Sequence, residues 1–182
     1  MKYFLIMLLF VSCNTQSKKR EIILEKIKVC DVNLLKGITM EARFEKDGRY
    51  QVPFFSKELR GRTYILPNYS YYGCPLNDLS CLNDATKKKF NIFEFATANS
   101  IDDKARALEF TGKYIEDVLS EFLNLGITEV LSSSAIGECV IFYYDKEHFA
   151  AYVANVNEVI NENWKIKFTK KNKISEHWYS NF

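Results

Sequence analysis

Residues 38–55 alternate between apolar and polar side chains, which is the pattern of β-strands with one buried face. Four apolar residues at every second position precede Asp47-Gly48: Ile38, Met40, Ala42 and Phe44. The apolar set resumes at Tyr50, Val52 and Phe54. Asp-Gly between two such runs predicts a β-hairpin.

The register of this hairpin is predicted from the face that it would bury. A two-residue loop at Asp47-Gly48 places Phe44 opposite Gln51 and mixes apolar with polar positions. A three-residue loop over residues 46–48 buries one whole face. It gives three apolar pairs: Phe44 with Tyr50, Ala42 with Val52, and Met40 with Phe54. We therefore expect the three-residue loop.

The pattern changes to steps of three and four residues between Ser100 and Leu125, which predicts a helix over about 102–125. Its apolar face consists of Leu108, Thr111, Ile115, Val118, Leu119, Phe122 and Leu123. Ser100 and Asp103 supply an N-terminal cap, and Gly126 ends the helix. This is the longest helix that the sequence predicts.

The remaining segments give weaker patterns. Residues 138–145 are apolar at consecutive positions, which predicts a central strand, and residues 149–156 would complete a second hairpin with it. Residues 172–180 are expected as a last strand, and residues 20–36 favour helix over strand. Residues 61–97 show little periodicity and are expected to be a long, partly irregular connection.

These elements predict one α+β domain, in which an antiparallel sheet of about five strands is packed by one long helix. Glycine and proline are scarce, and no linker or internal repeat divides the chain. A length of 182 residues suits a single domain with a sizeable core.

The first residues have the pattern of a secretory signal. Lys2 precedes an apolar run over residues 3–12, and a polar tract follows over residues 14–20. The run is about half the length that a helix needs to cross a bilayer, roughly 20 residues. The alternative is a first helix or strand of a cytosolic fold.

The residues Phe10-Val11-Ser12-Cys13 resemble the lipobox of bacterial lipoproteins, with Phe10 where leucine is usual. The resemblance covers about the first 13 residues and implies cleavage before Cys13, with acyl chains on its sulfur and on the new amino terminus. The predicted organisation is a signal peptide (1–12), a lipidated cysteine with a polar tether (13–20) and the domain (21–182). This places the protein at the inner or outer membrane of the cell envelope.

The charge balance argues against a nucleic-acid partner. The chain carries 25 basic and 23 acidic side chains, a net charge of +2, whereas nucleic-acid binders have a basic field. Short lysine clusters at residues 18–20, 87–89 and 170–173 are interpreted as solvated faces.

Four cysteines remain after Cys13, and an exported chain can oxidise them. We expect a disulfide between Cys74 and Cys81, because the residues between them favour a turn. Cys30 would then pair with Cys139 by elimination, and two buried free thiols are the alternative.

The candidate chemistry is sparse. The chain has two histidines, His148 and His177, and neither lies in a metal-binding motif, so no metal or cofactor is expected. Cys139 and His148 are expected at opposite ends of their hairpin. His177 could serve Cys139 as a base only if the last strand pairs with residues 138–145.

Aromatic residues remain as candidates for binding. Tyr69, Tyr71 and Tyr72 lie in a turn-rich stretch, where tyrosines suit protein or glycan contacts, unless they pack over the sheet. The sequence thus predicts a membrane-anchored envelope lipoprotein with a non-catalytic protein- or glycan-binding domain. The alternatives are an envelope hydrolase or thiol enzyme using Cys139 and His177, and a toxin-immunity or inhibitor lipoprotein.

Overall fold

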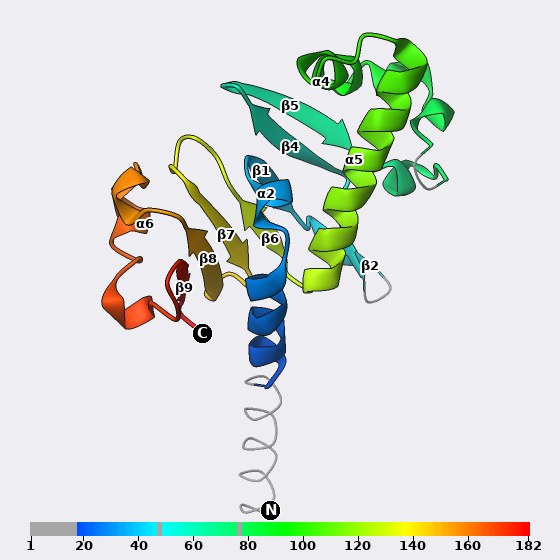
Figure 1. The fold of residues 1–182 in the computed structure, drawn as a ribbon. Helices are drawn as coiled ribbons and strands as arrows, with labels where there is room; N and C mark the ends of the chain where they lie inside the picture. Colours follow the sequence, from blue (N-terminus) through cyan, green and yellow to red (C-terminus); the bar gives the residue numbers. More distant parts are fainter. Residues whose placement is uncertain (1–17, 47–48, 76–77) are drawn as a thin grey trace, which may run out of the picture.

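The computed structural model describes residues 18–46, 49–75 and 78–182 (Figure 1). The predicted signal peptide, the lipobox, Cys13 and most of the predicted tether lie outside the described residues, as does Asp47-Gly48.

Seven antiparallel strands form one sheet in the order β5-β4-β1-β6-β7-β8-β9, and two more form a separate ribbon. The strands of the sheet are β1 (Ile38–Glu41), β4 (Phe54–Leu59), β5 (Arg62–Pro67), β6 (Glu129–Leu131), β7 (Cys139–Tyr143), β8 (Phe149–Val153) and β9 (Trp178–Ser180). The ribbon consists of β2 (Phe44–Lys46) and β3 (Arg49–Gln51). The α+β class and the antiparallel sheet are confirmed, with seven strands in place of the expected five.

Residues 18–29 form a helix, called here the N-terminal helix. The α-helices are α2 (Val32–Leu35), α3 (Asp84–Lys87), α4 (Ile92–Ala98), α5 (Lys104–Leu125) and α6 (Glu162–Lys165). The 3₁₀ turns are η1 (Tyr69–Tyr72), η2 (Leu79–Cys81), η3 (Val156–Glu158) and η4 (Lys170–Asn172). The helical prediction for residues 20–36 is confirmed, with an interruption where Asp31 caps α2.

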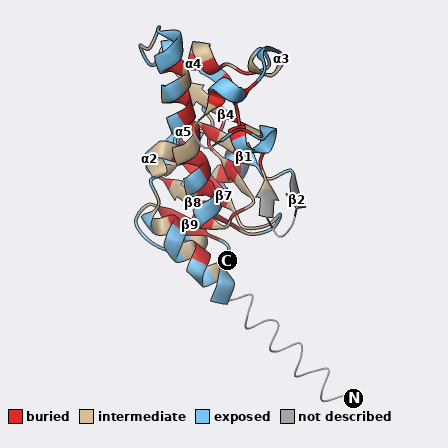
Figure 2. Cartoon of the chain, turned by 90° about the vertical axis from the view of Figure 1, so that its right-hand side faces the viewer, coloured by how far each residue is buried: buried red, intermediate tan, exposed pale blue. Residues whose placement is uncertain are grey.

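Helix α5 confirms the prediction of one long helix. The Asp103 side chain accepts a hydrogen bond from the Arg106 N–H at 2.9 Å, and Gly126 ends the helix with φ +70°. Buried positions recur at helical spacing from Ala107 to Leu125, and Figure 2 shows them where α5 meets the strands. Burial of this face fixes the helix on the sheet, because helices of this size owe most of their stability to tertiary packing.

The sheet separates two hydrophobic clusters, and β7 contributes to both. Val140 and Phe142 belong to the larger cluster, with α4, α5 and the N-terminal helix. Cys139 and Ile141 belong to the smaller cluster, which the segment around α6 covers. The prediction of a central strand covered on both faces is therefore confirmed.

The predicted register of the first hairpin is wrong. Phe44 pairs with Gln51, and Ile38 pairs with Lys57, so both parts follow the two-residue-loop register. The apolar alternation predicted the wrong register because residues 52–53 belong to no strand. Pro53 has no N–H to continue a ladder, and the break allows Val52 and Phe55, three positions apart, both to be buried.

The segment 61–97 is more regular than predicted, since it contains β5 and α4. Asn91 stabilises the outer edge of β5: its side-chain oxygen accepts from the Ile65 N–H, and its own N–H donates to the Ile65 carbonyl, both at 2.9 Å. The last strand is shorter than predicted: only Trp178–Ser180 are a strand, because the chain bends at residues 175–177.

Candidate functional site

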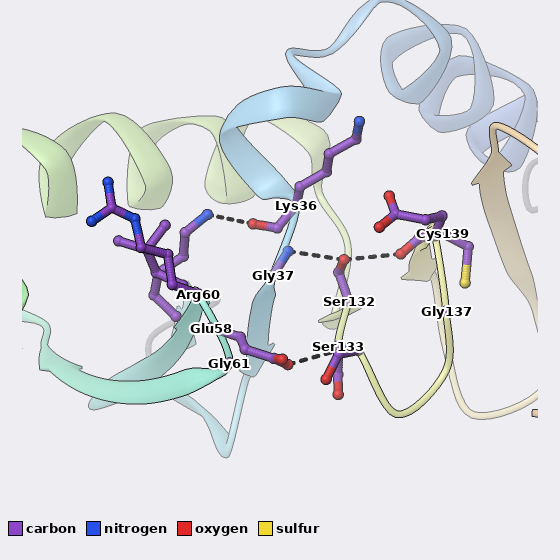
Figure 3. Close-up of a pocket in the computed structure, with 13 residues that line it drawn as sticks. Lys36, Gly37, Glu58, Arg60, Gly61, Ser132, Ser133, Gly137 and Cys139 are labelled. Atoms are coloured by element: carbon purple, nitrogen blue, oxygen red, sulfur yellow. Dashed lines mark hydrogen bonds between the residues drawn. The ribbon is translucent and has the colours of Figure 1, made fainter. Parts of the chain in front are cut away.

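A cleft of about 310 Å³ lies at one end of the sheet, where three separate connections meet (Figure 3). They are the link from α2 to β1, the β4–β5 turn and the loop over residues 132–138. Charged and hydroxyl side chains line much of it: Lys36, Lys57, Glu58, Arg60, Ser132, Ser133, Ser134 and Glu138. The sequence offered one signal for it, three consecutive serines between a strand and a glycine.

Ser132 joins two strands inside this cleft. Its hydroxyl accepts a hydrogen bond from the Gly37 N–H at 3.0 Å and donates one to the Cys139 carbonyl at 2.9 Å (Figure 3). Ser132 is buried, so both bonds form away from water. The hydroxyl therefore satisfies two backbone groups that would otherwise lack a partner.

Glu58 closes the cleft from the β4 side. Its carboxylate accepts from the Ser134 N–H at 2.9 Å. Hydrogen bonds from the side chain and backbone of Ser134 hold the pKa of Glu58 below its usual range, since they favour the charged form. The carboxylate is thus a fixed anion that holds the serine loop.

Lys57 occupies the opposite side of β4. Its ammonium group donates to the Lys36 carbonyl and lies 5.9 Å from the centre of the Tyr114 ring. Burial lowers the pKa of Lys57, because desolvation disfavours the ammonium ion. The inner polar groups of the cleft thus contact one another, and this arrangement fastens three loops. We interpret the cleft as a structural junction.

The thiols have the character of core residues. Cys139 is buried, and burial, with a smaller contribution from Glu138, raises its pKa to about 11. Burial is also the largest cause that raises the pKa of Cys30 to about 12. Both are free cysteines, which corrects the Cys30–Cys139 pairing in favour of the free-thiol alternative. A nucleophilic cysteine requires the opposite shift, toward the thiolate.

Neither histidine is placed to activate Cys139. His148 lies at the β7–β8 turn, at the far end of β7, where its Nδ1 contacts the Asp145 carboxylate at 2.8 Å. His177 precedes β9, which pairs with β8 and not with β7. The condition for the Cys139–His177 hypothesis is therefore not met, since Val153 of β8 lies between their strands.

The three candidate tyrosines separate into one buried and two exposed residues. Tyr69 is 3% exposed and belongs to the core, whereas Tyr71 and Tyr72 are 42% and 39% exposed. The rings of Tyr71 and Tyr72 meet edge to face with centroids 5.1 Å apart. Tyr72 also contacts Phe90 at 5.8 Å, a neighbour that the sequence did not indicate because it lies in another segment.

The backbone that carries this tyrosine pair is fixed on both sides. The Asn68 side chain accepts from the N–H groups of Ser70 and Tyr71, and Gly73 ends η1 with φ +77°. Cys74 follows directly and forms the predicted disulfide with Cys81, with Cα atoms 5.8 Å apart. The two exposed rings are thus presented by a rigid turn.

The aromatic residues near the C-terminus, by contrast, are part of the fold. Trp164, Trp178 and Tyr179 are all buried over the sheet. Within the described ranges, no cluster of three or more metal-binding side chains occurs, and no helix there has the length and apolar character to cross a membrane. No family model, curated protein or solved structure matches this chain.

Proposed function

We propose that the chain is a cell-envelope lipoprotein, attached to the membrane by acyl groups on Cys13, whose α+β domain binds a partner without catalysis. The lipobox-like Phe10-Val11-Ser12-Cys13 supports the attachment. The observation that carries the binding function is the exposed pair Tyr71 and Tyr72 on the η1 turn, which leads directly into the Cys74–Cys81 disulfide.

The geometry of the pair favours a protein partner over a glycan. Tyrosine offers a large amphipathic surface at a low entropy cost, and here the turn is already ordered before binding. The two ring planes are inclined by 84°, so the pair does not form one flat platform on which a sugar ring could lie. A toxin neutralised by this domain would be one such protein partner.

The anchor and the binding site can be tested separately. Intact mass of the protein from host membranes should show cleavage before Cys13 and added acyl chains. An uncleaved, unacylated chain would contradict the anchor.

For the binding site, a photo-crosslinking amino acid at position 71 should give a discrete protein adduct in the intact envelope. The matched control is position 65, because Ile65 is 40% exposed on an edge strand. Tyr72→Ala should abolish the adduct, and Tyr72→Phe should retain it, since the ring supplies most of the contact. The same adducts from both positions, or adducts with polysaccharide only, would contradict a protein site at the tyrosine pair.

A further inference from the structure

The segment that covers the second face of the sheet presents two different sides. Trp164 and Phe168 are buried and stack on each other with centroids 5.7 Å apart. Ile166, between them in sequence, is 70% exposed, and Ile174 is also exposed. The aromatic side chains thus hold the segment to the core, while large aliphatic side chains point to solvent without support from the fold.

The exposed isoleucines lie in a locally basic segment of the chain. Residues 162–176 contain five lysines and two glutamates, an excess of +3, whereas the whole chain has a net charge of +2. Glu162 faces Lys165 at 3.7 Å, and Glu176 faces His177 at 3.7 Å. We call the exposed remainder the C-terminal basic patch: Ile166, Lys167, Lys170, Lys171, Lys173 and Ile174.

Contacts with the core hold the patch in place. The Lys167 ammonium lies 4.2 Å from the centre of the Trp164 ring, and the Lys173 ammonium lies 6.0 Å from that of Tyr179. The Asn172 side chain donates to the Lys167 carbonyl at 2.8 Å. The fold therefore holds the backbone of the patch, and two of its lysine side chains, before any partner binds.

Contacts connect the C-terminal end of the chain, which follows the patch, with the start of the N-terminal helix. Lys19 lies 5.8 Å from the Tyr144 ring centre, and the Tyr144 ring contacts Phe182, the last residue, at 6.2 Å. Lys173 bridges to Tyr179, three residues before that end. Figure 1 shows α6 at the left edge of the view and the redder part of the same segment lower, beside β9 and the C-terminus. Four residues lie between Cys13 and Lys18, and the five steps of chain from one to the other span at most about 18 Å.

We propose that the C-terminal basic patch rests on the anionic headgroups of the membrane to which the chain is attached. Lysines would contact lipid phosphates, and Ile166 and Ile174 would enter the boundary between headgroups and acyl chains. A soluble polyanion would use the lysines but would gain nothing from exposed isoleucines. This inference rests on the membrane attachment in the proposed function.

Amine-reactive footprinting of the full chain tests the contact. The protein is incorporated through its N-terminal region into vesicles of phosphatidylcholine alone or of phosphatidylcholine with phosphatidylglycerol. Labelling of Lys167, Lys170, Lys171 and Lys173 should be at least about threefold slower on the anionic vesicles, and about 0.5 M salt should remove the difference. Lys88 and Lys89, exposed lysines in another part of the fold, serve as the internal control and should not change.

Two pairs of variants separate the patch from general charge effects. Lys170→Gln/Lys171→Gln should return the labelling of Lys167 and Lys173 to the phosphatidylcholine rate, whereas Lys88→Gln/Lys89→Gln should not. Ile166→Ser should weaken the protection, whereas Ile65→Ser should not. Near-ultraviolet circular dichroism checks that each variant is folded.

The outcomes also separate this inference from the proposed anchor. Acylated protein with equal labelling on both vesicles overturns the patch and leaves the anchor standing. Protection on anionic vesicles without acylation of Cys13 supports the patch and overturns the anchor. Heparin is the test for a soluble polyanion. If heparin protects the lysines as well as anionic vesicles do, and Ile166→Ser does not change that protection, the lipid contact is overturned in favour of a soluble polyanion.

Discussion

The Glu58 carboxylate accepts a hydrogen bond from the Ser134 N–H at 2.9 Å, across 76 residues of chain. This bond joins the end of β4 to the loop after β6, two strands that do not pair with each other. Because a carboxylate makes this contact, the stability of the cleft end of the sheet depends on pH.

Glu58→Gln should lower the free energy of unfolding at pH 7 by about 0.5–1 kcal/mol, a modest value because the carboxylate is largely exposed. Hydrogen bonds hold the folded pKa of Glu58 below its usual value, so its charge stabilises the fold at pH values above the pKa of the unfolded chain. The stabilisation is lost as the pH falls through the folded pKa. Urea unfolding should therefore show the gap between wild type and variant closing in acid. A gap that widens there would contradict the assignment.

Ser132→Ala should be more costly, because it leaves the Gly37 N–H and the Cys139 carbonyl without their hydroxyl partner. Loss of a buried partner of this kind costs about 1–3 kcal/mol. Chemical denaturation can measure this, with Ser175→Ala as the control because Ser175 is exposed. Equal stability of the two variants would refute the role given to the Ser132 hydroxyl.

Gly37→Ala and Gly61→Ala compare two glycines with similar backbones but different surroundings. Both have positive φ, +68° and +74°, but a Cβ at Gly37 would lie 2.5 Å from the Glu58 carbonyl oxygen, and a Cβ at Gly61 would meet nothing within 4 Å. We expect about 1–2 kcal/mol of destabilisation for Gly61→Ala from the left-handed conformation alone, and clearly more for Gly37→Ala. A shift in melting temperature measures both. If the two variants lose similar stability, the backbone around Gly37 can move to accept the added Cβ, which contradicts the prediction.

Alkylation should distinguish the described thiols. In folded, unreduced protein at pH 8, Cys30 and Cys139 should react slowly, because their pKa values of about 12 and about 11 keep both as thiols. Denaturation without reduction should expose two reactive cysteines, and reduction should release Cys74 and Cys81 as well. Mass spectrometry counts the added groups. Rapid modification of Cys139 in the folded protein would revive the thiol-enzyme alternative.

The sequence predicted best those elements whose signal is long or repeated. Helix α5 shows its period over many turns and carries its own cap at Asp103, and β7 is apolar on both faces because both faces are covered. The register of the first hairpin was predicted wrongly, because the strand is broken at residues 52–53. The apolar residues continue through Pro53, so the sequence pattern does not show this break.

The sites were less accessible to sequence reasoning. The cleft brings together Lys57, Glu58 and the serines at 132–134 from segments far apart in the chain, so the run of serines alone could not indicate its partners. The tyrosine stretch did indicate exposed aromatic residues, but only packing distinguishes the buried Tyr69 from Tyr71 and Tyr72.

Strand β6 has only three residues, yet it lies between β1 and β7 and joins the two halves of the sheet. The half with β4 and β5 and the half with β8 and β9 share no other strand pairing. Within the sheet, this short strand therefore carries the whole backbone pairing between the two halves. A force that pulls the halves apart would load the few hydrogen bonds of β6 together with the hydrophobic cluster that both halves share.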